Sequence, residues 1–241
     1  MHSFVRTNNS YPTRQPTKDR AISLHPASAA ASPPVDPVRQ RILEAAVEQF
    51  AEYGFEGTST RAIAAAAGAA MSSITYQFGG KEGLYLAAAD HIGEQISHIQ
   101  LPGIISARQA VDRGDLSPTD AIVAILGEMA NMMLDERSES WSAFIIREQQ
   151  KPGEAFDRLF ACFIQPMSES MIELVGMVRT DLSGRKLRAV ATGLIGQVIA
   201  LRSARAAMMR ILDISTMGDD VRTMISEAIT ANARAILQAK G

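Results

Sequence analysis

Polar side chains that can donate hydrogen bonds gather in one stretch of this chain, from Gly57 to Lys81, which contains no acidic residue. Hydroxyl, amide, guanidinium and ammonium groups of this kind suit phosphate oxygens and the edges of bases. The candidate donors are Thr60, Arg61, Ser72, Ser73, Thr75, Tyr76, Gln77 and Lys81. Only two of them carry positive charge, so attraction to a polyanion is modest and direct contacts must supply a larger share of any binding.

Short helices are predicted to position these donors. Pro37 suits the first turn of a helix, where a missing N–H costs nothing. Ile42, Ala46 and Phe50 then recur every four residues, which is the spacing of one apolar helix face. Gly54 is expected to end this first helix. Further helices are predicted over residues 60–66, 70–77 and 81–99.

The second and third of these helices are joined by a three-residue turn that contains Gly68. Two short helices joined in this way are typical of a helix-turn-helix. The glycine lets the chain reverse, and the alanines of the second helix allow the third to pack closely against it. In such a unit the third helix presents its outer face to the major groove of DNA. The pattern therefore favours a DNA-binding surface.

The run from Arg41 to Ile92 resembles the N-terminal domain of the TetR family of transcriptional regulators, without a gap. The positions that carry the resemblance are Ile42-Leu43, Ala45-Ala46, Phe50, Gly54-Phe55, Thr58, Thr60-Arg61, Ile63-Ala64, Ala67-Gly68, Ile74, Tyr76, Phe78, Gly80-Lys81-Glu82 and Leu84-Tyr85. The resemblance implies that residues 60 and 61 contact phosphates or bases, that residues 72–77 lie on the recognition helix, and that Lys81 holds a phosphate. The chain has Ser72 where the family usually has Gly or Pro, and Thr75 where it usually has an aromatic residue. Base preference therefore does not follow from the resemblance.

The C-terminal two thirds of the chain are predicted to be almost entirely helical. Helices are expected from Pro118, over residues 140–150, from Glu154, and over residues 185–212 and 217–239, with Pro166 kinking or ending the helix that contains it. Ten of the twelve methionines lie in this part. Methionine adapts its shape to apolar ligands, so the Met- and Phe-rich region around Pro166 is a candidate pocket, against a plain helical core as the alternative.

Residues 141–167 also resemble the regulatory domain of the CecR-like branch of the TetR family, whose members are linked to sensitivity to drugs or toxic compounds. The resemblance rests on Phe144, Arg147-Glu148, Pro152, Ala155-Phe156 and Pro166. Arg147 and Glu148 are predicted to act in the pocket or in signal transmission, and an ordinary surface pair is the alternative. The predicted ligand-binding residues are Met129, Met133, Phe144, Arg147, Glu148, Phe160, Phe163, Met167 and Met171.

Small residues recur along the predicted helix that ends at residue 212. They are Ala189, Ala191, Gly193, Gly196, Ala200, Ala204 and Ala207. Small side chains allow two helix backbones to approach closely, so this helix and the last one are predicted to form a symmetric four-helix dimer interface. Packing inside one subunit is the alternative.

The remaining composition narrows the class of protein. The net charge is −2 and 46% of the residues are hydrophobic, which excludes disorder of the whole chain. One proline-rich segment, residues 1–36, is nevertheless predicted as a disordered extension, with a basic arm on DNA as the alternative. No apolar stretch in the C-terminal half reaches the about 20 residues that span a bilayer, and no export signal is present. With a single cysteine, a reducing cytoplasm is the expected location.

Several chemistries have no residues to support them. Cys162, the single cysteine, excludes a disulfide within the chain and a multi-cysteine zinc site, and is expected in the core rather than as a redox sensor. His91 and His98 are too widely spaced to ligate one metal ion from a helix, and are expected on the surface. No phosphate-binding glycine motif and no nucleophile elbow is present. We expect no cofactor, no metal and no enzymatic activity.

These observations predict an all-α protein with a DNA-binding domain at residues 37–81 and a regulatory domain at residues 82–241. It would be a homodimer that binds a near-palindromic operator in double-stranded DNA and, as a repressor, is released by a small apolar or drug-like ligand. An activator is the open alternative within this interpretation. Two rival classes are a helical carrier or receptor with weak or lost DNA binding, and a helical enzyme that uses Arg147 and Glu148.

Overall fold

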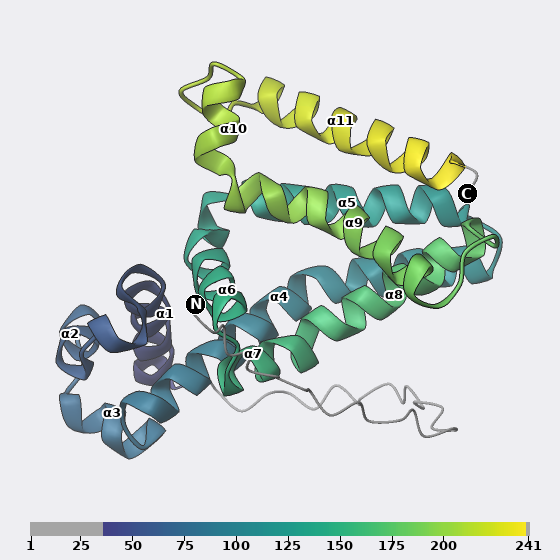
Figure 1. The fold of residues 1–241 in the computed structure, drawn as a ribbon. Helices are drawn as coiled ribbons and strands as arrows, with labels where there is room; N and C mark the ends of the chain where they lie inside the picture. The colour runs from purple at the N-terminus through teal and green to yellow at the C-terminus, as the bar shows by residue number, and fades with distance from the viewer. Residues whose placement is uncertain (1–35, 240–241) are drawn as a thin grey trace, which may run out of the picture. The chain divides into compact units, whose positions relative to one another are not determined.

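The computed structural model describes residues 36–239, and every regular element in that range is a helix (Figure 1). The all-α prediction is confirmed. The predicted extension and its alternative as a basic arm lie outside the described residues, except for Asp36. The α-helices are α1 Pro37–Gly57, α2 Thr60–Ala66, α3 Met71–Phe78, α4 Lys81–Asp112, α5 Pro118–Leu134, α6 Glu139–Gln150, α7 Glu154–Leu159, α8 Gln165–Val178, α9 Gly184–Ser203, α10 Arg205–Ile211 and α11 Asp219–Gln238.

Capping side chains and glycines mark most of the boundaries of the first three helices. The Asp36 carboxylate accepts a hydrogen bond from Val38 N at 2.9 Å at the start of α1. The predicted end of this helix at Gly54 is wrong by one turn: Gly54, at φ 72° and ψ 177°, interrupts α1, which continues to Gly57. Ser59 Oγ accepts from Ala62 N at 3.1 Å and caps α2. Gly79, at φ 74°, ends α3 in the left-handed region, which a glycine reaches without strain.

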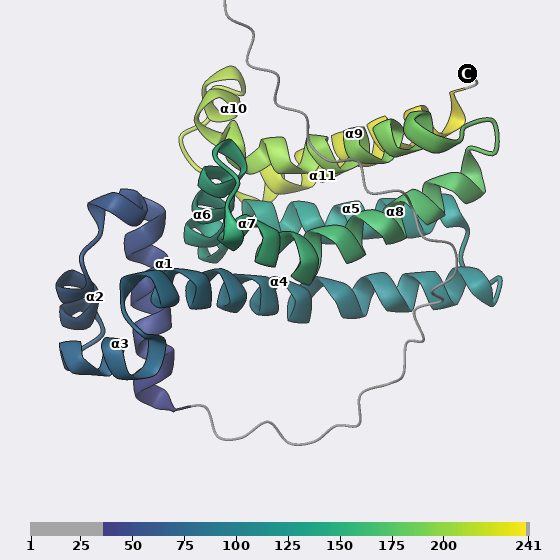
Figure 2. The same ribbon diagram turned by 60° about the horizontal axis from the view of Figure 1, so that its bottom comes forward.

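The long helix α4 connects these helices to the rest of the chain (Figures 1 and 2). Its predicted end near Ile99 is wrong, because α4 continues through Pro102 to Asp112. A proline inside a helix removes one hydrogen bond. Beyond Ile99, Leu101 and the buried Ile104 pack against the hydrophobic core formed largely by α5, α8, α9 and α11, which favours continuation of the helix.

The buried apolar residues form two cores, and α6 and α7 belong to the first of them. That core contains the inward faces of α1, α2 and α3 and the first half of α4, together with Phe144 of α6 and Ala155 and Leu159 of α7. The second core lies between α5, α8, α9 and α11. Segments from the C-terminal two thirds therefore hold the helix-turn-helix by burial of apolar surface.

Pro166 is accompanied by a local change in the helix, in accord with the predicted kink. Between α7 and α8, residues Phe160–Ile164 form one π-helical turn, and the chain then continues as α8. Pro166 has no N–H to donate to the carbonyl of Cys162, four residues earlier. Ser97 Oγ of α4 donates to that carbonyl at 3.2 Å instead. The π-turn and its partner on α4 thus replace the hydrogen bond that the proline removes.

The predicted helix over residues 185–212 is broken at about two thirds of its length. Ala204, at φ −110° and ψ 18°, separates α9 from α10. The side chain of Arg202, two residues before the break, reaches back to the backbone carbonyl of Asp135 and to Ser138. The last helix, α11, covers most of the range predicted for it.

His91 is buried, whereas exposure was predicted for it, and His98 is exposed as predicted. His91 lies on the face of α4 that packs on α1. Burial lowers its pKa below the ordinary 6.5, and Arg39 acts in the same direction against the opposing effect of Glu94 and Glu44.

The buried His91 predicts a dependence of stability on pH. Its lowered folded-state pKa means that the unfolded chain takes up a proton more readily, so stability is present above pH 6.5 and is lost as pH falls through the folded-state pKa. The urea midpoint of the native protein should fall between pH 7.5 and pH 5.5. The fall should be smaller in His91→Gln and unchanged in His98→Gln, and equal slopes for all three proteins would contradict this assignment.

Candidate functional site

Helix α3 presents a polar face that points away from the first core. Ile74 is fully buried on its inner side, while Ser72, Thr75 and Tyr76 are exposed on the outer side. The phenol of Tyr76 is 91% exposed, although a large aromatic side chain normally gains from burial. An aromatic ring held in solvent on a recognition helix is free to contact a base or a phosphate. At the start of α2, Arg61 is exposed and Thr60 is half-buried.

The other predicted DNA contacts are partly engaged within the protein. Gln77 Nε2 donates to the Asp36 carboxylate at 3.0 Å and so ties α3 to the start of α1. The Lys81 ammonium lies over the ring of Phe55, 4.5 Å from its centroid. Ser73 is half-buried. The structure therefore brings the eight predicted donors onto α2, α3 and the start of α4, with Ser72, Thr75, Tyr76 and Arg61 the most exposed among them.

Two arginines beside this surface escaped the sequence analysis, which considered only residues 57–81. Arg41 Nε donates to the carbonyl of Ala67, at the end of α2, at 3.1 Å. The exposed guanidinium of Arg39 lies 5.1 Å from the ring centroid of Phe78, at the end of α3. Both arginines stand just before the apolar stripe of α1 and are exposed. Their position outside that stripe was the signal in the sequence that could have indicated them. They add positive charge next to the helix-turn-helix.

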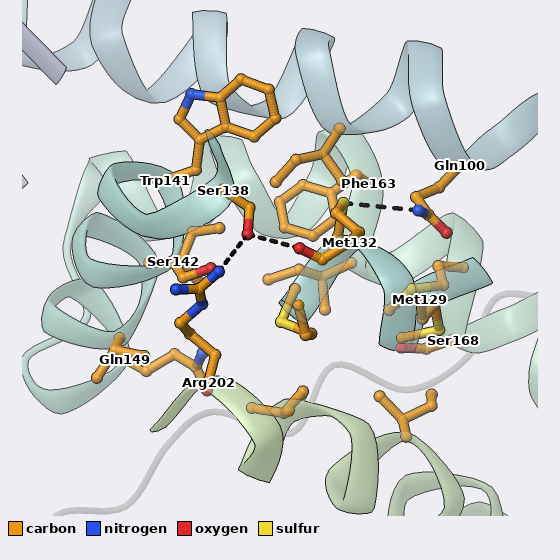
Figure 3. A pocket seen from close by; sticks show the side chains of 18 of the residues that line it. Gln100, Met129, Met132, Ser138, Trp141, Ser142, Gln149, Phe163, Ser168 and Arg202 are labelled. Atoms are coloured by element: carbon orange, nitrogen blue, oxygen red, sulfur yellow. Dashed lines mark hydrogen bonds between the residues drawn. The ribbon is translucent and has the colours of Figure 1, made fainter. Parts of the chain in front are cut away.

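A cavity of about 340 Å³ lies among helices α4 to α9 and the π-turn. Its walls are formed mainly by methionine, isoleucine and aromatic side chains (Figure 3). Five of the predicted ligand-binding residues line it: Met129, Met133, Phe160, Phe163 and Met167. The volume lies at the lower end of the range of about 300–1,000 Å³ that is usual for small-molecule sites.

Four predicted ligand-binding residues lie outside the cavity lining. Met171 packs in the core of the bundle, where the apolar stripe of α8 faces α5 and α9. Phe144 is buried in the first core, with its ring 4.9 Å from that of Tyr85. Arg147 and Glu148 follow Phe144 on the same side of α6. Helical periodicity explains the difference, because these three residues share the face of α6 opposite to the cavity.

Arg147 and Glu148 instead join α6 to the helix-turn-helix. The Arg147 guanidinium donates to the carbonyls of Ala51 at 3.1 Å and Glu52 at 3.3 Å, near the end of α1. The buried Glu148 carboxylate accepts from the Tyr85 hydroxyl of α4 at 2.5 Å. Burial, and then this hydrogen bond, raise the pKa of the Tyr85 hydroxyl, so it stays protonated as the donor.

The cavity face of α6 was missed from the sequence. Trp141, Ile145 and Gln149 recur every four residues on that face and line the cavity. Their recurrence every four residues was the available signal, because it is offset by one residue, about 100° around a helix, from the row that contains Phe144 and Glu148. Arg202 and Gln100 also line the cavity. Polar neighbours such as Ser97, His98 and Ser203 surround them in the sequence, so nothing in it singled them out.

Neither a membrane-spanning helix nor a metal site is found among the described residues. No helix within residues 36–239 is long and apolar enough to cross a membrane. In the same range, no group of three or more His, Cys, Asp or Glu residues is placed to hold a metal ion. The arrangement is an exposed recognition helix connected by α4 and α6 to a cavity-bearing bundle, and this defines a DNA-binding regulator of the helix-turn-helix class.

Comparisons with known proteins agree with this class. Residues 42–88 match the family model of bacterial regulatory proteins of the tetR family, and residues 118–240 match the model for the C-terminal domain of the HTH-type transcriptional dual regulator CecR. The chain belongs to the TetR family, in the branch defined by that CecR domain, as the sequence analysis predicted.

Individual relatives extend over most of the chain. It is 29% identical over 206 residues to the dual regulator CecR of Shigella flexneri, covering 83% of this chain and 91% of that one. It is 33% identical over 133 residues to the regulatory protein RaaS of Mycobacterium tuberculosis, covering 55% of each. The crystal structure of AibR in complex with isovaleryl coenzyme A and operator DNA has the same fold, with a TM-score of 0.62, 15% identity and coverage of 81% of this chain and 97% of that chain. CecR and RaaS are both transcriptional regulators.

Proposed function

We propose that the protein is a homodimeric repressor that a small ligand releases from its operator. In this proposal residues 37–81 form the DNA-binding domain and residues 82–241 the regulatory domain. One observation carries it: α6 lines the cavity with one face and holds the helix-turn-helix with the other. The AibR structure, which contains both an acyl coenzyme A and operator DNA, supports a ligand-responsive regulator on this fold.

The two faces of α6 provide a physical route between ligand and DNA. A ligand that displaces Trp141 or Ile145 moves α6, and Arg147 and Glu148 then pull on the end of α1 and on α4. In a dimer such a movement changes the distance between the two recognition helices, which must match half-sites about one helical turn apart. A ligand that binds the released form about 5–150-fold more tightly would suffice to change occupancy.

The proposed dimer interface uses α9 and α11, where small residues remain exposed. Ala189, Gly193, Gly196 and Ala200 of α9 are exposed, whereas Ala191 is buried inside the subunit. A Cβ atom added at Gly193 would meet no atom within 4 Å, so packing within the subunit does not require glycine there. An exposed smooth stripe of this kind suits close approach of a second copy.

Gly193→Glu should convert the dimer to a folded monomer, because it places a charge in the close contact between helices. Light scattering after size-exclusion chromatography measures the mass, and circular dichroism checks the helix content. Gly193→Ala is the matched control and should remain dimeric. A dimeric Gly193→Glu protein would place the interface elsewhere.

Selection of bound duplexes from random DNA, followed by a salt titration, tests the DNA-binding function. We expect a two-fold symmetric site bound with an affinity on the order of 10⁻⁸–10⁻¹¹ M that weakens steeply with salt. Tyr76→Ala should weaken the selected site by about 10–100-fold, which corresponds to about 1–3 kcal/mol, and change unfolding little because Tyr76 is exposed. If no sequence is enriched, the protein is a helical receptor or carrier without operator binding.

A further inference from the structure

The cavity contains a single charged side chain among the described residues that line it, the guanidinium of Arg202 on α9. The other polar lining residues are neutral serine, threonine, glutamine or similar groups, and most of the wall is apolar. A charge that faces an apolar cavity is expensive unless a partner of opposite charge neutralises it. The position of Arg202 therefore needs an explanation in terms of a partner.

Arg202 has hydrogen-bond acceptors within the protein, and these acceptors carry no negative charge. Arg202 Nη2 donates to Ser138 Oγ at 3.0 Å and to the carbonyl of Asp135, both uncharged acceptors. Its Nε is buried and, within the described part of the chain, has no hydrogen-bond partner. The carboxylate of Asp135 is paired with Arg137 at 2.7 Å, and Glu136 and Glu139 are exposed at the surface. One face of the guanidinium fork is thus left without an anion.

The surroundings of Arg202 would accept one negative charge. Ser142 and Gln149 of α6 lie beside the guanidinium at one end of the cavity (Figure 3). Burial, and then neighbouring Arg205, lower the pKa of Arg202 against the opposing effect of Glu139, Asp135 and Glu136, and none of these four residues lines the cavity. A single cation with neutral hydroxyl and amide neighbours matches a monoanion such as a carboxylate, which can pair with the fork through two hydrogen bonds.

The rest of the cavity suits a hydrocarbon. Away from Arg202, the walls are formed by Met132, Phe163 and Met129, and the far end is marked by Gln100 and Ser168 (Figure 3). Gln100 donates to Met132 Sδ at 3.5 Å, while its carbonyl oxygen is buried without a partner in the described structure. A ligand with a hydrogen-bond donor at its far end would satisfy that oxygen.

We infer that the cavity binds an amphipathic organic acid, with its carboxylate on Arg202 and its hydrocarbon body between the methionine and aromatic side chains. This inference rests on the proposed function, because it assigns the chemistry of the effector. A carboxylate on Arg202 competes with Ser138 for the guanidinium. Ser138 lies immediately before α6 and lines the same cavity, so the head group acts at the start of the helix that holds the DNA-binding helices.

Trp141, the only tryptophan of the chain, lines the cavity and reports binding directly. The experiment titrates the full-length protein, without DNA, with decanoate, 1-decanol and decylammonium below their micelle-forming concentrations, and follows Trp141 fluorescence. Decanoate should bind saturably and about 10–100-fold more tightly than decanol, because its carboxylate forms charge-assisted hydrogen bonds with the guanidinium and decanol offers only a neutral hydroxyl. Decylammonium should bind more weakly than decanol. Equal affinities for decanoate and decanol, or no saturable binding of either, would overturn the inference, and this comparison needs no variant.

Arg202→Met tests the residue itself. It should abolish the preference for decanoate and leave the affinity for decanol within about threefold of the native value. Arg202→Lys keeps a positive charge and serves as the second variant, since Arg202 also holds Asp135 and Ser138. It should retain part of the preference. A preference that survives in Arg202→Met would overturn the assignment.

The outcome is independent of operator binding. A protein that prefers decanoate through Arg202 and yet selects no DNA sequence would support this inference and remove the proposed repressor function. A protein that selects an operator and shows no preference for decanoate would keep the repressor function and remove the organic acid as its effector class.

Discussion

Replacing Phe144 by alanine should lower the free energy of unfolding by about 3–5 kcal/mol, the usual cost of removing a buried phenyl ring. Phe144 is 1% exposed and contacts Tyr85 in the core that unites α6 with the helix-turn-helix. Removal of the ring leaves a cavity between α6 and α4, so the side chains of both helices lose packing contacts. Urea denaturation followed by circular dichroism measures the change. The operator affinity of the folded fraction should fall as well, since α6 no longer holds α4 firmly.

Phe160→Ala is the matched control, because it removes the same ring from a different environment. Phe160 is 42% exposed and lines the cavity, so its removal should cost less than about 1 kcal/mol of stability. It should instead weaken the binding of a hydrocarbon ligand. Equal losses of stability in the two variants would contradict the separation between the core around Phe144 and the cavity around Phe160.

The helix-turn-helix could be predicted from sequence because local signals specify it. Apolar residues at helical spacing, cap residues and the turn glycine at residue 68 act over a few neighbouring positions, and the structure has α2 at the predicted residues. The polar residues of α3 then follow from periodicity, with Ile74 inside and Tyr76 outside. Gln77 was predicted as a DNA contact, and its hydrogen bond to Asp36 depends on a tertiary approach of α3 to α1 that spacing does not reveal.

The cavity was harder to predict because its walls come from six α-helices and the π-turn. A Met- and Phe-rich composition indicated the region, and Met129, Phe163 and Met167 do line it. Composition cannot decide which face of an apolar helix meets a cavity and which meets a core. Glu148 therefore lay in the predicted pocket, while in the structure its buried carboxylate meets Tyr85 of α4. Arg202 was missed because the break after α9 that accompanies its orientation has no strong local signal.

Helix α6 combines both roles because its sequence has two apolar faces. Trp141 and Ile145 face the cavity, and Phe144 faces the first core. A helix with apolar residues on two sides must be covered on two sides, which places it between a ligand site and the DNA-binding helices. Arg147 and Glu148 add hydrogen bonds to α1 and α4 beside the apolar contact of Phe144. The second resemblance found in the sequence is thus a signature of the connection between the two parts more than of the ligand site.

Gly54→Ala should destabilise the protein by about 1–3 kcal/mol, although replacing glycine by alanine in or near a helix usually stabilises it. At φ 72° and ψ 177°, Gly54 occupies a region that is essentially restricted to glycine. A Cβ atom there would lie 2.9 Å from Nη1 of Arg147. The guanidinium would have to move, and its hydrogen bonds to the carbonyls of Ala51 and Glu52 would be lost.

Gly127→Ala supplies the control with the opposite sign. Gly127 lies inside α5, and a Cβ atom added there would meet nothing within 4 Å, so the substitution should stabilise the protein by up to about 1 kcal/mol. Urea midpoints measured for both variants give the two signs. The double variant Gly54→Ala/Arg147→Ala separates the backbone strain from the collision with Arg147, because relief of the collision makes the two effects less than additive. A neutral or stabilising Gly54→Ala would show that the end of α1 does not depend on this glycine for its contact with α6.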